Sequence, residues 1–251
     1  MTNETAAGLA AGESVLGAWV ESASPRLAEA LAATRLDWLG IDMEHTPVGP
    51  GEVESLVRAI HPDATPIVRL PSVEYAVARG CKLALDAGAG GVIVPRVESA
   101  ADAEAVVEAA TFPPDGDRGV AGSVRANGFG EGFDEHVATA DDERLVVVQL
   151  ETAAGIEHAD DIVSVPGVDV AFVGENDLSA SLGTPGEKTR EPVQDGVEAV
   201  RRAASEAGVH AGVAARDGET RAEREAQGFR FFLLGGDCSL AREGLAARLD
   251  D

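Results

Sequence analysis

Two carboxylates, Glu151 and Asp177, each follow a short apolar run rich in Val, at residues 145–150 and 168–173. Both runs are bounded by helix-like sequence, which is typical of buried parallel strands. Because the carboxyl ends of parallel strands open onto one face, we expect these carboxylates to lie side by side there. Hard oxygen ligands of this kind suit a divalent cation with open coordination positions, such as Mg²⁺ or Mn²⁺. The alternative interpretation is that Glu151 caps the next helix and Asp177 lies in a turn.

Four other polar residues stand near the ends of two further apolar runs: Asp42, Glu44, His45 and Arg69. At a shared mouth, the metal would act as a Lewis acid on a keto oxygen, and the arginine would neutralise developing negative charge. Since histidine titrates near neutrality, His45 could move a proton. The combination predicts chemistry on a small carboxylate-bearing substrate through an enolate. On pattern alone, His45 could instead be merely exposed, and Arg69 could pair with a helix carboxylate.

These residues belong to a regular alternation of apolar runs and helix-like segments. Eight runs lie at residues 15–20, 38–43, 66–70, 91–97, 145–150, 168–173, 210–215 and 229–234. Strict alternation implies a parallel sheet, and eight units imply closure into a barrel. An open doubly wound sheet usually has fewer units, and no GxGxxG motif follows the first run. We therefore predict an α/β fold, a (β/α)8 TIM barrel in one domain over residues 1–251, with a polar lead-in at 1–14 and a terminal helix at 239–251.

The chain is strongly acidic, with a net charge of −24 spread along its 251 residues. Such a field repels nucleic acid and anionic membrane surfaces, so neither is expected as a partner. Its 20 cationic residues include two lysines only. An acidic surface almost without lysine is what we expect of a cytoplasm at molar salt, as in a halophilic archaeon, where the self-repulsion is screened. The alternative is an ordinary acidic protein from a GC-rich genome.

The scarce lysines and cysteines narrow the chemistry further. Lys82 falls inside a predicted helix and Lys188 in a polar loop, so neither offers a buried Schiff-base amine at a strand end. A metal-dependent route is therefore favoured over a covalent one. Cys81 and Cys238 are expected to be free thiols of a reducing cytosol. No apolar run approaches about 18 residues and the first residues lack signal-peptide features, which favours a cytoplasmic location.

Residues 111–133 form the longest stretch without a clear period. A loop this long in a compact domain is usually functional or ordered against a partner. It contains Arg118 and Arg125. These arginines could bind an anion or could tie the loop to the barrel.

Six motifs, in order, resemble the HpcH/HpaI aldolases, the class II pyruvate aldolases. They are DMEHTP at 42–47, VRLP at 68–71, LDAGA with a following VP at 85–95, FPPDGDRG at 112–119, VQLE at 148–151 and GENDLS at 174–179. The segment SVRANGFG at 123–130 is most similar to the 2-dehydro-3-deoxyglucarate aldolases, and the 4-hydroxy-2-oxoheptanedioate aldolases are nearly as similar. Citrate lyase β and malyl-CoA lyase are more distant relatives that would need a CoA site, and no clear basic patch offers one.

This resemblance implies a metal and substrate site. Glu151 and Asp177 would hold Mg²⁺ or Mn²⁺, with Co²⁺ as a further alternative. Pyruvate would chelate the metal through its carboxylate and keto oxygens. Gln149 and the backbone at Asn176 and Asp177 would hold the pyruvate.

The resemblance also implies the catalytic groups and the assembly. Arg69 would stabilise the enolate oxygen, and His45 would take the hydroxyl proton of a 4-hydroxy-2-oxo acid so that the C3–C4 bond breaks. Asp86 would raise the basicity of that histidine, and in the family it can act across a subunit interface. The family is typically hexameric, with the terminal helix exchanged between neighbours. The implied activity is reversible cleavage to pyruvate and an aldehyde, and the alternative of another class is a barrel that binds a keto acid without catalysis.

The sequence departs from the family pattern at three places. Met43 replaces a glycine, and Glu175 replaces a proline beside a predicted metal ligand. Residues 213–216 lack the usual pattern after the seventh strand. These changes bear on substrate preference more than on the metal site.

Overall fold

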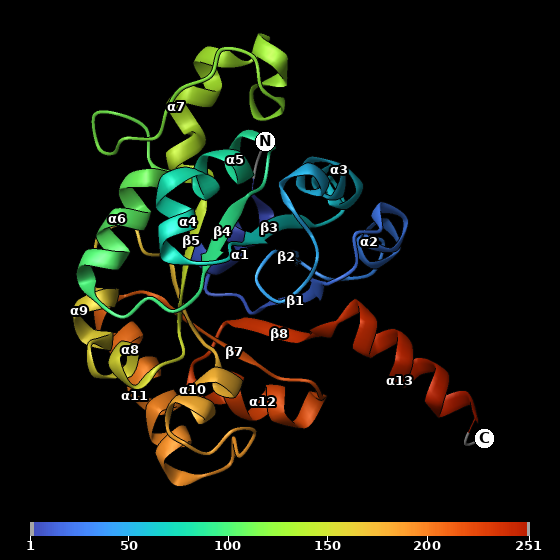
Figure 1. Cartoon of the computed structure of the whole chain (residues 1–251), viewed down its shortest axis with the longest axis vertical. Coiled ribbons are helices and arrows are strands. Elements are labelled where there is room, and N and C mark those ends of the chain that lie inside the picture. The colour runs from blue at the N-terminus through green and yellow to red at the C-terminus, as the bar shows by residue number, and fades with distance from the viewer. Residues whose placement is uncertain (1–2, 250–251) are drawn as a thin grey trace.

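A computed structural model of the chain describes residues 3–249 and has eight parallel strands closed into a barrel (Figure 1). The strands are β1 (Val15–Val20), β2 (Trp38–Asp42), β3 (Thr65–Arg69), β4 (Gly91–Val94), β5 (Leu145–Leu150), β6 (Val170–Val173), β7 (His210–Ala214) and β8 (Phe231–Gly236). Each strand pairs with its neighbour in sequence, and β8 closes on β1 with Val15 opposite Phe231. The predicted (β/α)8 barrel is therefore confirmed. Within residues 3–249, no helix has the length and apolar character to cross a membrane.

Helices surround the barrel and connect its strands (Figure 1). They are α1 (Glu4–Ala10), α2 (Pro25–Ala32), α3 (Pro50–Ile60), α4 (Val73–Tyr75), the π-helix η1 (Ala76–Gly80), α5 (Cys81–Asp86), α6 (Ala100–Ala110), the 3₁₀ helix η2 (Arg125–Gly130), α7 (Phe133–Glu143), α8 (Ala153–Glu157), α9 (Ala159–Val163), α10 (Glu175–Ser181), α11 (Glu191–Ala207), α12 (Gly218–Gln227) and α13 (Asp237–Leu249). The start of α2 illustrates the local signals, since Ser24 accepts a hydrogen bond from the backbone of Leu27 and proline occupies the first turn.

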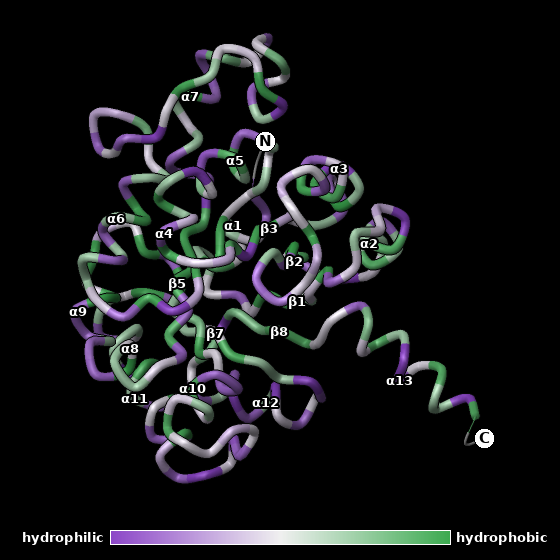
Figure 2. Tube along the Cα trace, viewed as in Figure 1, coloured by the Kyte–Doolittle hydropathy of each residue, from purple (hydrophilic) through white to green (hydrophobic). Residues whose placement is uncertain are grey.

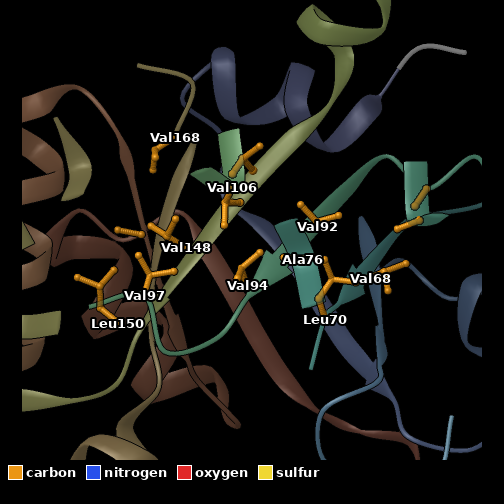
Figure 3. Packing of buried hydrophobic residues seen from close by; sticks show 14 of the residues in the cluster. Val68, Leu70, Ala76, Val92, Val94, Val97, Val106, Val148, Leu150 and Val168 are labelled. Carbon is orange, nitrogen blue, oxygen red and sulfur yellow. The ribbon is translucent and has the colours of Figure 1, made fainter. Parts of the chain in front are cut away.

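Side-chain alternation along the strands separates two apolar layers. Outward residues such as Val146 and Val148 of β5 pack against the surrounding helices, whereas Val147 points into the barrel. Figure 3 shows part of the outer layer, which includes Val68, Val92 and Val94 of the strands and Val106 of α6. Along the tube of Figure 2, apolar residues gather on the strands and polar residues recur on the helices.

Four aromatic residues lie inside the barrel: Trp19, Trp38, Phe172 and Phe231. Trp38 stacks on Phe231 with ring centroids 4.3 Å apart. Trp19 contacts Trp38 edge-on, with ring centroids 5.9 Å apart. Glycine makes room for both indoles, because a Cβ at Gly17 would lie 2.1 Å from the Trp38 ring and one at Gly40 would lie 2.2 Å from Trp19. These rings thus fill the interior of the barrel.

The structure differs from the sequence prediction in its helices. Helix α7 was not predicted, and the helical segment between β3 and β4 contains the π-helical turn η1. The helical segment between β5 and β6 is broken at His158 into α8 and α9. The terminal helix begins at Asp237, two residues before its predicted start at Ser239, whose hydroxyl bonds the backbone of Gly236.

Helix α13 projects away from the barrel (Figure 1). Its apolar side chains are left in solvent, with Leu245 61% and Leu249 79% exposed. Residues 1–2 of the predicted lead-in and residues 250–251 of the predicted terminal helix lie outside the described residues.

Candidate active site

The carboxyl ends of the strands open onto a cavity of about 500 Å³. Strand alternation explains which side chains reach it, because each lies two positions beyond an inward-facing residue: Asp42 after Gly40, Arg69 after Ile67 and Gln149 after Val147. The predicted site residues that line the cavity are His45, Arg69, Gln149, Asn176 and Asp177. Glu151 continues the same alternation and is buried behind Gln149.

Arg69 is held rigidly at one wall of the cavity. Its Nε and Nη2 each donate to Asp42 at 2.8 Å, and its Nη1 lies 3.1 Å from Oε2 of Glu44. Register brings the pair together, since Asp42 on β2 lies directly opposite Arg69 on β3. The guanidinium also stacks 4.3 Å from the ring centroid of Trp19. Its partners are therefore strand-end acids, and the alternative of a helix carboxylate is wrong.

Glu151 is fixed by two donors. Gln149 Nε2 donates to its Oε2 in a short hydrogen bond, and the backbone N–H of Arg96 donates to its Oε1 at 3.0 Å. Arg96 adopts a left-handed conformation, with φ 52°, to aim that N–H. The alternative role of Glu151 as a helix cap is wrong, because Thr152 accepts the capping bond from Gly155.

Gly174 is required where β6 leaves the barrel. A Cβ at this position would lie 2.3 Å from Oε2 of Glu151 and 3.1 Å from Nε2 of Gln149. Both distances are closer than ordinary van der Waals contact, and the first is closer than real Cβ atoms approach anything. The glycine therefore lets the next loop pass against the buried carboxylate.

Carboxylates crowd this end of the barrel. Burial raises the pKa of Glu151 to about 7, and repulsion by Glu44 and Asp177 adds to the rise. Burial likewise raises the pKa of Glu44 to about 7, against the lowering effect of Arg69. Asp177 lies in the first turn of α10, half-buried, and its carboxylate accepts no hydrogen bond from residues 3–249. A cation would relieve this repulsion.

The donor set fits a hard divalent cation. Glu151 follows β5 and Asp177 lies in α10, which follows the neighbouring β6, and both offer carboxylate oxygens. Beside them, Oε1 of Gln149 is buried and has no hydrogen-bond partner within the described part of the chain. A buried polar atom without a partner is costly, and a cation bound beside Glu151 would give this oxygen a partner.

A second acidic group of side chains is explained without a metal ion. Among residues 3–249, one group of three has its ligand atoms within 4.8 Å of one another: Glu21, Asp237 and Cys238. Asp237 already accepts hydrogen bonds from the backbones of Glu21, Ser22 and Cys238 and from the Ser22 hydroxyl. Its oxygens tie β1 to the start of α13, which is a structural role.

His45 stands at the rim of the cavity. Its side chain is 58% exposed, and its Nε2 lies 3.5 Å from Oε2 of Glu44. Asp42 shapes the turn that carries it, because Oδ1 of Asp42 accepts from the backbone N–H groups of Glu44 at 3.0 Å and His45 at 3.5 Å. The imidazole is thus exposed and also lines the cavity, where a substrate can reach it.

Asp86 is not brought to this cavity within one chain. It lies at the end of α5, where its Oδ1 accepts from Nη2 of Arg118 at 2.7 Å. It lines a different hollow together with Arg125 and Phe129. The Arg118 guanidinium is almost fully buried and stacks on Phe112 at 4.3 Å. Of the two roles considered for Arg118, tying the long loop to the barrel is the one observed.

Comparison with known proteins identifies the family. The family model described as HpcH/HpaI aldolase/citrate lyase matches residues 15–243. The chain belongs to this family. The HpcH/HpaI chain is 40% identical to a hydroxypyruvate/pyruvate aldolase of Paraburkholderia phytofirmans, over 94% of this chain and 92% of that protein.

Two further similarities support the assignment. The HpcH/HpaI chain is 36% identical to a 2-keto-3-deoxy-L-rhamnonate aldolase of Klebsiella pneumoniae, over 99% of this chain and 92% of that protein. A crystal structure of an HpcH/HpaI aldolase/citrate lyase family protein from Burkholderia cenocepacia superposes with a TM-score of 0.92 at 37% identity, covering 99% and 98% of the two chains. The predicted resemblance to HpcH/HpaI aldolases is therefore confirmed.

Proposed function

We propose that this chain is a divalent-metal-dependent pyruvate aldolase, which reversibly cleaves a 4-hydroxy-2-oxo acid to pyruvate and an aldehyde. The observation that carries the proposal is the buried, unpartnered Oε1 of Gln149 beside Glu151, at a mouth shared with Arg69 and Asp177. The similar aldolases named above support the reaction type. They act on hydroxypyruvate, pyruvate or a deoxy sugar acid by name, so the predicted 2-dehydro-3-deoxyglucarate preference stays a prediction.

Glu151 and Asp177 would hold Mg²⁺, Mn²⁺ or Co²⁺, which when bound supplies a Lewis acid for the keto oxygen. Gln149 would hold the pyruvate portion beside Glu151. Its free amide oxygen is an acceptor, so it suits the cation rather than the carboxylate and keto oxygens of pyruvate. Asn176 and Asp177 lie in the first turn of α10, where backbone N–H groups have no helical partner and remain available to a carboxylate.

His45 acts as the general base. It takes the proton of the C4 hydroxyl, the C3–C4 bond breaks, and the oxygen left on C4 becomes the aldehyde carbonyl. The electron pair of that bond forms the enolate of pyruvate, whose negative oxygen is stabilised by Arg69. A proton returned to C3 completes pyruvate, so atoms and charge balance.

Asp86 would raise the basicity of His45 from a neighbouring subunit. Two features support an assembly, for which we propose the homohexamer typical of the family. Asp86 lies away from the His45 of its own chain, and α13 leaves apolar side chains in solvent, ready to pack on a neighbour. The acidic charge argues against nucleic-acid and membrane partners, and we place the enzyme in the cytoplasm.

The direct test is cleavage of 4-hydroxy-2-oxo acids by the purified protein, with pyruvate measured by a coupled dehydrogenase. We expect pyruvate to be released with Mn²⁺ or Mg²⁺ and not after treatment with EDTA. Binding of pyruvate without any turnover of these acids would support the non-catalytic alternative instead.

A further inference from the structure

The active-site cavity has an outer wall that the proposed reaction does not use. Lys188 and Arg216 line it, from the loop after α10 and from the segment after β7. Arg69, the third cation lining the cavity, is engaged by Asp42 and Glu44. By contrast, neither Lys188 nor Arg216 forms an ion pair or side-chain hydrogen bond with any residue between 3 and 249. We refer to these two side chains as the cationic wall.

Other cations of the described residues, Arg26 among them, also lack an ion pair, but Lys188 and Arg216 differ from Arg26 because they line the cavity. Glu175, an acid of the same cavity, is engaged elsewhere: its Oε1 lies 3.6 Å from Arg224 and 3.4 Å from Nε2 of Gln194. Gln194 also donates to the backbone carbonyl of Lys188 at 2.8 Å, which holds that loop in place. The charge of Lys188 is thus positioned but not neutralised.

The other acids of the cavity are also poor partners for the wall. Asp42 is engaged by Arg69, and Asp177 is assigned to the metal. Glu21 forms no ion pair within the described residues. Burial and the nearby Asp237 raise the pKa of Glu21, which disfavours its charged form and so weakens its attraction for a cation. The wall therefore presents positive charge toward the cavity.

We infer that the cationic wall binds an anionic oxygen group, carboxylate or phosphate, at the end of the aldehyde remote from its reacting carbonyl. This inference rests on the proposed function, because it takes the pyruvate end of the substrate to lie at Gln149 and Arg69. The other end of the same molecule must then extend along the cavity toward the wall. A lysine point charge and an arginine fork are the side chains best suited to such a group. The enzyme would select acidic aldehydes over neutral ones of the same length.

The test compares matched aldehydes in the aldol addition of pyruvate, with Mg²⁺ and at constant ionic strength. One pair is succinic semialdehyde and butanal, and the second is glyceraldehyde 3-phosphate and glyceraldehyde. We expect Lys188→Gln and Arg216→Gln each to lower kcat/KM for the anionic member of a pair about tenfold, the loss of one charge-assisted hydrogen bond. We expect no more than about a twofold change for the neutral member. The pair that shows the larger loss distinguishes carboxylate from phosphate recognition.

Arg26→Gln is the control, because it removes one exposed cation on α2 that does not line the cavity and has no ion pair within residues 3–249, and it changes the net charge equally. It should leave both members of each pair unchanged. Equal effects of Lys188→Gln and Arg216→Gln on anionic and neutral aldehydes, or no effect on either, would overturn the inference. Exchange of the pyruvate methyl protons, measured without any aldehyde, separates the two claims. If all variants exchange but none shows a preference for anionic aldehydes in the addition reaction, the cationic wall alone is refuted. If the wild type does not exchange, the proposed function is refuted and the cationic wall with it.

Discussion

Gly174→Ala is the substitution whose effect follows most directly from the site geometry. The new Cβ would lie 2.3 Å from Oε2 and 2.7 Å from Cβ of Glu151, more than 0.5 Å short of the 3.4 Å at which ordinary contact begins. Glu151 cannot yield easily, because Gln149 and the Arg96 backbone hold both its oxygens. Overpacking of this kind costs about 1–3 kcal/mol of folding stability. Displacing a supporting contact of a metal ligand lowers metal affinity by about 10- to 100-fold.

Metal titration by calorimetry and thermal unfolding with EDTA measure these two effects separately. Gly218→Ala is the matched control, since it also adds a methyl group at the start of a helix but finds nothing within 4 Å. We expect the control to keep the wild-type metal affinity. A Gly174→Ala protein with unchanged metal affinity and unchanged melting temperature would refute the placement of Glu151 against this loop.

Four other predictions follow from the same structure. His45→Ala should lower the cleavage rate by about 10²–10⁴ while leaving the Kd for Mn²⁺ unchanged, as measured by stopped assays and calorimetry; unaltered turnover would exclude His45 as the base. The raised pKa of Glu151 means that the metal-free fold loses stability as pH rises from about 4.5 to about 7, since ionisation is then less favourable in the folded state. Melting in EDTA should show this fall, and Glu151→Gln should make it shallower. Arg118→Met leaves Asp86 without its partner and should cost about 3 kcal/mol in urea unfolding, with Arg26→Met as the surface control. Because unscreened acids repel, the melting temperature should rise from dilute buffer to molar KCl, and a flat response would argue against adaptation to salt.

The barrel could be predicted from the sequence because its strands are Val-rich runs with clear boundaries. The strand of residues 145–150 was located without error, and the start of β6 was placed two residues early. Helix α7 was missed because Ala140 is its one buried residue, so it carries almost no apolar period to detect. Its boundaries are set by contacts with the rest of the fold rather than by an apolar stripe.

The cavity residues at strand ends could be predicted for a similar reason, since alternation places Gln149 and Arg69 inside the mouth. The support given to Glu151 by the Arg96 backbone could not, because it depends on a left-handed conformation that no residue type signals there. The closeness of Gly174 to that carboxylate depends likewise on the path of the loop after β6. The position of Asp86 at a helix end offered no pattern, and the family resemblance alone pointed to it.

Exchange of the pyruvate methyl protons into D₂O, followed by NMR in KCl with Mg²⁺, tests the central claim most directly. It requires enolate formation at the Glu151 and Asp177 site and no knowledge of the aldehyde. We predict exchange that depends on Mg²⁺, stops with EDTA and falls sharply in Glu151→Gln. Absence of exchange with Mg²⁺ bound, or exchange that persists in EDTA and in Glu151→Gln, would contradict the account.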